Sequence, residues 1–177
     1  MSTGNPSLAR IGDYLGMETG VSDWIEVTQE QVDSFAEVTD DHQWIHQSQP
    51  ETLTGPFGGP VAHGLLVLSI AFKLAREAEA LPQSTWIIYG YDKLRFRAPV
   101  RIGKRIRCRT TVLNVCHLGQ RVLLTVRFKV EIEGEIIPAL VADCSLLCLN
   151  DQEDISTPDV LREDRTSATE HIKIGPA

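Results

Sequence analysis

One stretch of the chain, residues 65–72 (LLVLSIAF), limits the fold more than any other. It forms the first half of a segment, residues 62–80, that we predict to be one long helix, with charges gathered in its second half. A helix that is apolar on every face must be surrounded by protein or lipid. The whole apolar stretch, residues 61–74, contains His63 and Lys73 and is shorter than the roughly 20 residues that cross a bilayer. We therefore expect other parts of the chain to wrap around this helix.

The segments after Pro82 supply that wrapping, because their apolar residues recur with period two. We expect strands at residues 86–96, 105–112, 122–132 and 136–149. Turn residues at Gly119-Gln120 and Glu133-Gly134 predict hairpins between the later strands. The pattern predicts an α+β fold in which one antiparallel sheet curls around the long helix.

The remaining segments set the domain boundaries. Thr28 and Gln31 have the spacing of a capping box and predict a short helix ending near Thr39. Prolines and glycines make residues 40–60 irregular, and residues 1–20 are turn-rich. We expect one domain at residues 10–149 and an acidic surface extension or mobile tail at residues 150–177.

Composition narrows the classes of partner. The net charge of -7 argues against binding to nucleic acid or to an anionic membrane. The first ten residues lack the basic-then-apolar order of a secretory signal, so we expect a soluble, cytoplasmic protein. The four cysteines show no CxxC spacing, which predicts reduced thiols with neither a disulfide frame nor a zinc site.

Two clusters carry groups suited to chemistry. Residues 40–46 (DDHQWIH) place carboxylates and imidazoles in a loop directly after a helix. Residues 58–65 (GGPVAHGL) lead into the long helix, whose first N–H groups and positive dipole end stabilise a developing oxyanion. Gly64 has no side chain, so a substrate carbonyl can approach its N–H closely.

The spacing of Asp41, His46 and Gly64 resembles that in the MaoC-like dehydratases, the (R)-specific enoyl-CoA hydratases of hot-dog fold. The segments GVSDWI, TDDHQWIH and GPFGGPVAHG are similar to the nodulation-protein-N branch of that family, and so is KLRFRAPVRIGKRI at residues 93–106. The resemblance covers residues 12–149. It implies a single hot-dog domain that reversibly hydrates a 2-enoyl thioester of coenzyme A or acyl-carrier protein.

The resemblance also implies residue roles. Asp41 and His46 would hold and activate water, and the Gly64 amide would bind the thioester oxygen. We expect His63 and Trp44 near the substrate, and for His63 the interpretation of a residue that only packs at the helix entrance fits at least as well. Family members with Asn-Pro in this loop differ from Gln43-Trp44 here. Some place a serine on the central helix where Phe72 stands, and Ser69 is a candidate substitute.

The chemistry is reasonable without the family, because a carboxylate and a neutral imidazole that share one water can act as base and acid in turn. It requires no redox cofactor and no metal. Simpler interpretations stay open: Asp41 as a turn residue, Asp40 as a capping residue, and His42 with His46 as zinc ligands. At the level of function, a hot-dog thioesterase and a non-catalytic acyl-thioester binding module are the alternatives.

Basic residues are concentrated in one segment, since eight of the seventeen lie in residues 93–109. A solvated sheet face explains this slightly better than a site for the phosphates of coenzyme A. In the second interpretation, Arg95, Arg97 or Lys104 contributes. Apolar residues left on one sheet face and its edges predict a homodimer with a continuous sheet.

Overall fold

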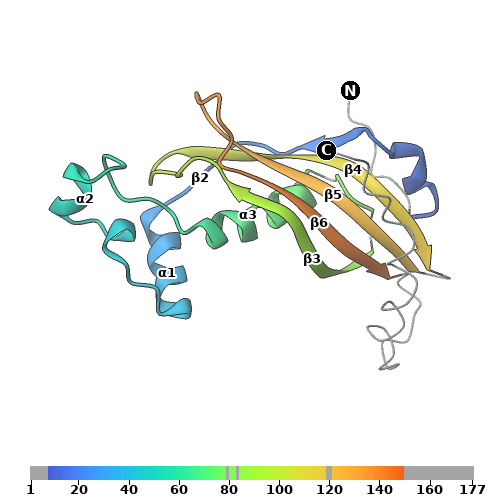
Figure 1. Ribbon diagram of the computed structural model, residues 1–177, viewed down its shortest axis with the longest axis horizontal. Helices are drawn as coiled ribbons and strands as arrows, with labels where there is room; N and C mark the ends of the chain where they lie inside the picture. Colours follow the sequence, from blue (N-terminus) through green and yellow to red (C-terminus); the bar gives the residue numbers. More distant parts are fainter. Residues whose placement is uncertain (1–7, 79, 83, 119–120, 150–177) are drawn as a thin grey trace, which may run out of the picture.

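A computed structural model describes residues 8–78, 80–82, 84–118 and 121–149. Its centre is one six-stranded sheet that curves around a long helix, α3 (Figure 1). Along the sheet the strands run β1-β4-β5-β6-β3, and β2 pairs with β4 beside β1. The expected α+β architecture, an antiparallel sheet wrapped around a central helix, is confirmed.

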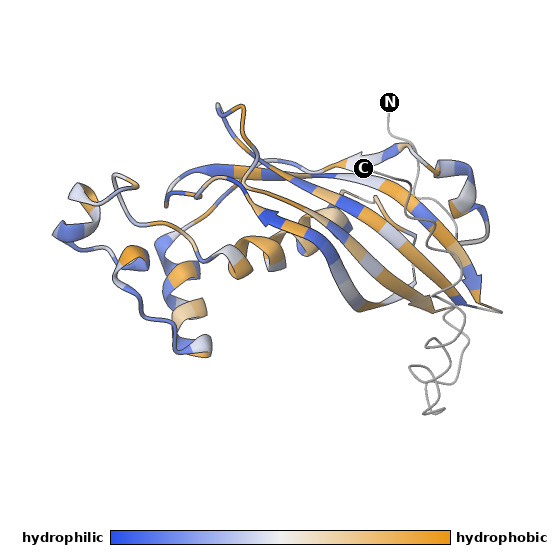
Figure 2. Ribbon diagram, viewed as in Figure 1, coloured by the Kyte–Doolittle hydropathy of each residue, from blue (hydrophilic) through white to orange (hydrophobic). Residues whose placement is uncertain are grey.

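The four long strands are β3 (Thr85–Phe96), β4 (Arg105–Leu118), β5 (Arg121–Ile132) and β6 (Leu140–Leu149), all paired antiparallel. Buried and less buried residues alternate along β4 and β5, as the period-two pattern predicts. Figure 2 shows the matching alternation of hydrophobic and hydrophilic residues along these strands. β6 begins at Leu140 and not at the expected residue 136, because residues 133–139 form a turn and bends between the strands. Ile136, in this connection, is fully exposed. The predicted turn at residues 119–120 and the tail at residues 150–177 lie outside the described residues.

Two short strands and a 3-10 helix were not predicted from the sequence. β1 (Glu18–Val21) and β2 (Ile25–Glu26) pair with β4, after a 3-10 helix, η1 (Leu8–Tyr14). Strands of four and two residues are too short to show a period, and the glycines around them are typical of turns. They are strands because β4 offers them backbone partners.

The central helix α3 spans Gly64–Glu77, slightly shorter than the expected residues 62–80. Its inner face packs on the sheet through Val67, Leu68, Ile70, Ala71, Leu74 and Ala75. The prediction that it is enclosed on every side is wrong for the single chain, since Leu65 is 58% exposed and Ser69 lies on the same open face. No helix among the described residues is long and apolar enough to cross a membrane.

A small helical region lies beyond the N-terminal end of α3 (Figure 1). It contains α1 (Gln29–Thr39), η2 (Trp44–His46) and α2 (Pro50–Thr54). The capping box of Thr28 and Gln31 is present at the start of α1, as expected. The Val61 N–H donates to the Ile45 carbonyl at 3.0 Å, and the Ala62 N–H donates to the Val100 carbonyl at 2.8 Å. These bonds tie the η2 segment to the residues that lead into α3, and those residues to the connection between β3 and β4.

Candidate active site

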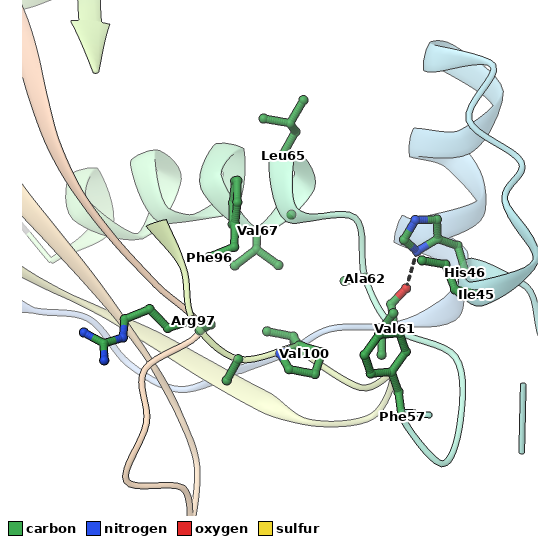
Figure 3. Close-up of a pocket in the computed structure, with 14 residues that line it drawn as sticks. Ile45, His46, Phe57, Val61, Ala62, Leu65, Val67, Phe96, Arg97 and Val100 are labelled. Atoms are coloured by element: carbon green, nitrogen blue, oxygen red, sulfur yellow. Dashed lines mark hydrogen bonds between the residues drawn. The ribbon is translucent and has the colours of Figure 1, made fainter. Parts of the chain in front are cut away.

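A cavity of about 420 Å³ opens at the N-terminal end of α3 (Figure 3). Its wall is mostly apolar, and Ile45, Gly64, Phe96 and Val100 contribute to it. His46 lies on one side of the cavity and Arg97 on the other, with the guanidinium directed outward. The cavity can therefore hold an apolar chain and a reacting group beside an imidazole.

His46 is held with one ring nitrogen free. It is 7% exposed, and its Nδ1 lies 2.7 Å from the Val61 carbonyl oxygen. Because a carbonyl only accepts, Nδ1 carries the proton in the neutral ring and Nε2 keeps a lone pair. Burial lowers the pKa of His46 below its ordinary value of 6.5, although the bond to Val61 acts in the opposite direction. The ring is therefore a neutral base at physiological pH.

Asp41 is ionised beside that ring. Gln43 donates from Nε2 to Asp41 Oδ1 at 2.9 Å, and this bond is the largest cause of the lowered pKa of Asp41. The carboxylate is partly exposed and is not part of the cavity wall. Gln43 was not recognised from the sequence as a functional residue, although an amide two residues after a carboxylate suits such a contact.

His63 lies behind His46, away from the cavity wall. It is 3% exposed, and its ring stacks on that of His46 with centroids 3.7 Å apart. His63 Nε2 lies 3.0 Å from the Asp41 carbonyl oxygen and 4.0 Å from Asp41 Oδ2. The structure thus places this residue against the two candidate catalytic groups.

Gly64 is the first residue of α3 and lines the cavity. A first helical residue has no intrahelical acceptor for its N–H, and the preceding His63 makes no side-chain cap. A Cβ at this position would lie 3.0 Å from the ring of Phe96, so only glycine fits without displacement. The start of α3 therefore offers an N–H group to a ligand in the cavity.

Asp41, His46 and His63 bring one polar atom each to within 4.8 Å of one another. Two groups at such a separation can share one water, since each hydrogen bond spans about 2.8 Å. A carboxylate and two imidazoles are also a zinc-type donor set, but two ligand atoms of a tetrahedral site with bonds of about 2.1 Å lie only about 3.4 Å apart. Nearly parallel stacked rings, 27° apart, aim their lone pairs side by side rather than at one point. The arrangement suits a water molecule better than a metal ion.

The neighbouring candidates lie elsewhere. Asp40 is the left-handed C-cap of α1, with a φ of 54°, and its side chain is 99% exposed. His42 is also exposed, 3.7 Å from that Asp40 carboxylate, so the predicted alternative of a His42–His46 zinc pair is wrong. Of the two adjacent acids, only Asp41 lies beside His46 and His63.

Three other residues considered from the sequence do not reach the cavity. Trp44 is 46% exposed and packs over Gly55. Ser69 lies on the open face of α3 and donates to the Leu65 carbonyl at 2.9 Å, so it does not support Asp41. Phe72 instead packs edge-on against Trp86 and Phe128 in the core.

The basic residues of residues 93–109 fall into two groups. Lys104 pairs with Glu135 at 3.2 Å, and Arg95 donates to its own neighbour, the Leu94 carbonyl. Arg105, Arg107 and Arg109 pair with acids on adjacent strands, as the interpretation of a solvated face predicts. Lys93 also has a partner, Asp143, at 3.8 Å. Within residues 93–109, Arg97 and Arg101 are the two basic residues whose side chains make no such contact, and Arg97 lines the cavity.

Comparison with known proteins identifies the family of this chain. The family model for the MaoC-like domain matches residues 11–133. The chain belongs to the MaoC-like domain family. It is 40% identical to 3-hydroxyacyl-thioester dehydratase Z of Mycobacterium tuberculosis over 139 residues, which cover 77% of this chain and 92% of that protein. It is 38% identical to nodulation protein N of Rhizobium leguminosarum, over 84% of this chain and 94% of that protein.

Solved structures of other proteins share the fold. The A. caviae (R)-hydratase superimposes with a TM-score of 0.60 at 20% identity, covering 76% of this chain and 98% of that one. A protein from Archaeoglobus described as a monoamine oxidase regulatory protein gives a TM-score of 0.69 at 21% identity, over 85% of this chain and 99% of that one. The expected hot-dog fold is confirmed.

Proposed function

We propose that the chain catalyses the reversible hydration of trans-2-enoyl-CoA to (R)-3-hydroxyacyl-CoA, with Asp41 and His46 acting on the water. The observation that carries this proposal is an ionised carboxylate beside a neutral imidazole, where the imidazole and an open helix N-terminus line the same cavity. Relatives named as a 3-hydroxyacyl-thioester dehydratase and a 3-hydroxybutyryl-CoA dehydratase support the reaction class. The (R) configuration is that of the hydratases sharing this fold.

In the proposed reaction, His46 Nε2 removes a proton from a water that the Asp41 carboxylate also binds. The water oxygen forms the bond to C3, and the π electrons of the enoyl group move toward the thioester oxygen. The Gly64 N–H stabilises that oxygen, a contribution that is worth roughly a hundredfold to a thousandfold in other enzymes. The proton returns from the imidazolium to C2, so one water is added and nothing is oxidised or reduced. No step calls for a redox cofactor or a metal.

The carrier and the partner subunit are also proposals. Arg97, and with it Arg101, is better placed for the phosphates of the carrier than Arg95 or Lys104, because both of the latter already have acceptors. The edge strand β3 exposes Ile88, Tyr89 and Phe96, and α3 exposes Leu65. We expect a second copy of the chain to cover these residues in a homodimer, which light scattering tests.

A direct assay tests the activity. Purified protein is incubated with crotonyl-CoA and with longer 2-enoyl-CoAs, and the products are analysed by mass spectrometry and chiral chromatography. Addition of one water with an intact thioester and an (R) product is the expected result. Release of free thiol would indicate the thioesterase instead, and binding without turnover would indicate a non-catalytic module. Incubation with a chelator should leave the hydration rate unchanged.

A further inference from the structure

We propose that His63 is a positioning residue that holds the Asp41 carboxylate and the His46 ring in a fixed orientation relative to each other. This role rests on the proposed hydratase function. The ring of His63 lies between the two elements that carry the chemistry, since His63 is the residue before α3 and contacts the loop after α1. It does not line the cavity, so it reaches the substrate only through its neighbours.

Two contacts give His63 this role. On one side, Nε2 lies 3.0 Å from the Asp41 carbonyl oxygen, which makes Nε2 the protonated nitrogen and fixes the backbone of the carboxylate residue. On the other side, the face of the ring supports His46 at a centroid distance of 3.7 Å. His46 is therefore held from two directions, by the Val61 carbonyl at its edge and by His63 at its face.

The second nitrogen of His63 shows that packing is not the whole explanation. Nδ1 is buried and has no hydrogen-bond partner in the described chain. An unpaired buried nitrogen is unfavourable, and a phenyl ring would fill the same space beside Phe35 without that disadvantage. What phenylalanine lacks is the Nε2–H that bonds to Asp41.

His63 also affects the charge of its neighbour. Two titratable groups face His46: the Asp41 carboxylate from the loop and His63 from the start of α3. Asp33 of α1 does not contact His46 but shares a partner with it, because the Gln29 amide donates both to Asp33 and to the His46 carbonyl. A positive charge on His63 would lower the pKa of His46, whereas Asp41 raises it. Stacked imidazoles thus favour a neutral His46, the form that acts as base.

The test compares His63→Phe, which keeps a stacked ring without the donor, with His63→Gln, which keeps a donor without the ring. His42→Gln is the control, because His42 is an exposed histidine of the loop that carries Asp41. We expect His63→Phe to lower kcat at least tenfold with KM changed less than threefold, and to move the acid limb of the kcat profile to higher pH. His63→Gln should recover part of kcat, and His42→Gln should behave as wild type.

The opposite outcomes are distinct. A fall in melting temperature with kcat and the pH profile unchanged would show that His63 only packs, and a rise in KM alone would show that it touches the substrate. NMR titration of His46 in wild type and His63→Phe needs no substrate, so it also decides the question if hydration is not observed. A higher pKa of His46 in the variant supports the proposal, and an unchanged value overturns it. If His63→Phe does not fold, the same comparison is made with His63→Gln.

Discussion

Polar groups around the candidate active site are partly unpaired, whereas charged groups on the outer face of the sheet are paired. On the sheet, arginines of β4 face acids across the strands: Arg105 with Glu133, Arg107 with Glu131 and Arg109 with Glu18. At the site, by contrast, His63 Nδ1 is buried without a partner and the first N–H of α3 is not capped by a side chain. His46 Nε2 is likewise left with a free lone pair.

The comparison separates two uses of charge. Cross-strand pairs on a solvated face contribute modestly to stability, because water screens them. A rigidly held group with an unused hydrogen-bond donor or acceptor lowers the stability of the fold, but that donor or acceptor can still bind a ligand or react. At the cavity, where His46 Nε2 and the first N–H of α3 are left unpaired, we place the chemistry, and on the outer face of the sheet, where the charges are paired, we expect structure alone.

The largest expected effect comes from the site itself. Asp41→Asn and His46→Gln should each lower kcat by roughly a hundredfold to ten-thousandfold, the usual contribution of general acid–base catalysis. The melting temperature should change little for Asp41→Asn, because that side chain is partly exposed, and modestly for His46→Gln, which replaces a buried ring with an amide that can still donate to the Val61 carbonyl. Steady-state kinetics with crotonyl-CoA and thermal unfolding measure both quantities. Either variant retaining more than one tenth of the wild-type kcat would contradict the assigned roles.

Much of the sheet could be predicted from the sequence, because each long strand repeats its own signal. Residues 105–112 and 122–132 alternate, and β4 and β5 alternate in burial as expected. The short strands β1 and β2 escaped because their structure depends on β4 and not on a local pattern. The exposed face of α3 was not predicted for a related reason: an apolar stretch of sequence does not show whether the same chain or a second chain covers it.

Candidate site residues could be named from the sequence, but their geometry could not be derived from it. Asp41, His46 and Gly64 were proposed from the resemblance to a known family, and the structure brings the first two together with His63 and places Gly64 at the cavity. The hydrogen bond between His63 and the Asp41 carbonyl was not predictable, because the two residues are 22 positions apart in the sequence and meet only in the folded chain. Likewise, strand register decides which arginines find an acid, so composition alone could not single out Arg97.

The open helix N-terminus provides the second prediction. Gly64→Ala places a methyl group 3.0 Å from the Phe96 ring, and the adjustment moves the N–H relative to the substrate. We expect kcat to fall about tenfold, less than the roughly hundredfold loss that a misplacement of about 1 Å can cause, because this contact requires a shift of only a few tenths of an ångström. Gly64→Ala combined with Phe96→Leu should recover part of the loss. Gly12→Ala is the control, because nothing lies near a Cβ at that position.

A pair of arginines tests the comparison directly. Arg97→Ala should raise KM for an acyl-CoA about tenfold, the effect of losing a hydrogen bond to a charged group, without changing KM for a truncated thioester that lacks the phosphates. Arg107→Ala should leave both KM values within twofold, because Arg107 bonds to Glu131 at 2.8 Å and stacks over Trp24. Equal effects of the two substitutions on KM would show that pairing does not separate structural from functional arginines.

The smallest expected effect lies wholly on the sheet. Glu131 is 19% exposed in its side chain and accepts from Arg107 at 2.8 Å and from Lys129 at 3.0 Å. Burial by itself would raise its pKa, but the bonds from Lys129 and Arg107 outweigh burial and lower it below the ordinary value of 4.5. The ionised folded form therefore contributes stability above that value, and the contribution is lost as the pH falls through the lowered pKa.

Glu131→Gln should accordingly reduce the free energy of unfolding by about 1 kcal/mol at neutral pH and by less once the wild-type carboxyl is protonated. Urea unfolding of both proteins at neutral and acidic pH measures the difference, and hydration activity should stay at the wild-type level. A loss of activity without a loss of stability would mean that the paired face takes part in the reaction, and the contrast between the two regions would then fail.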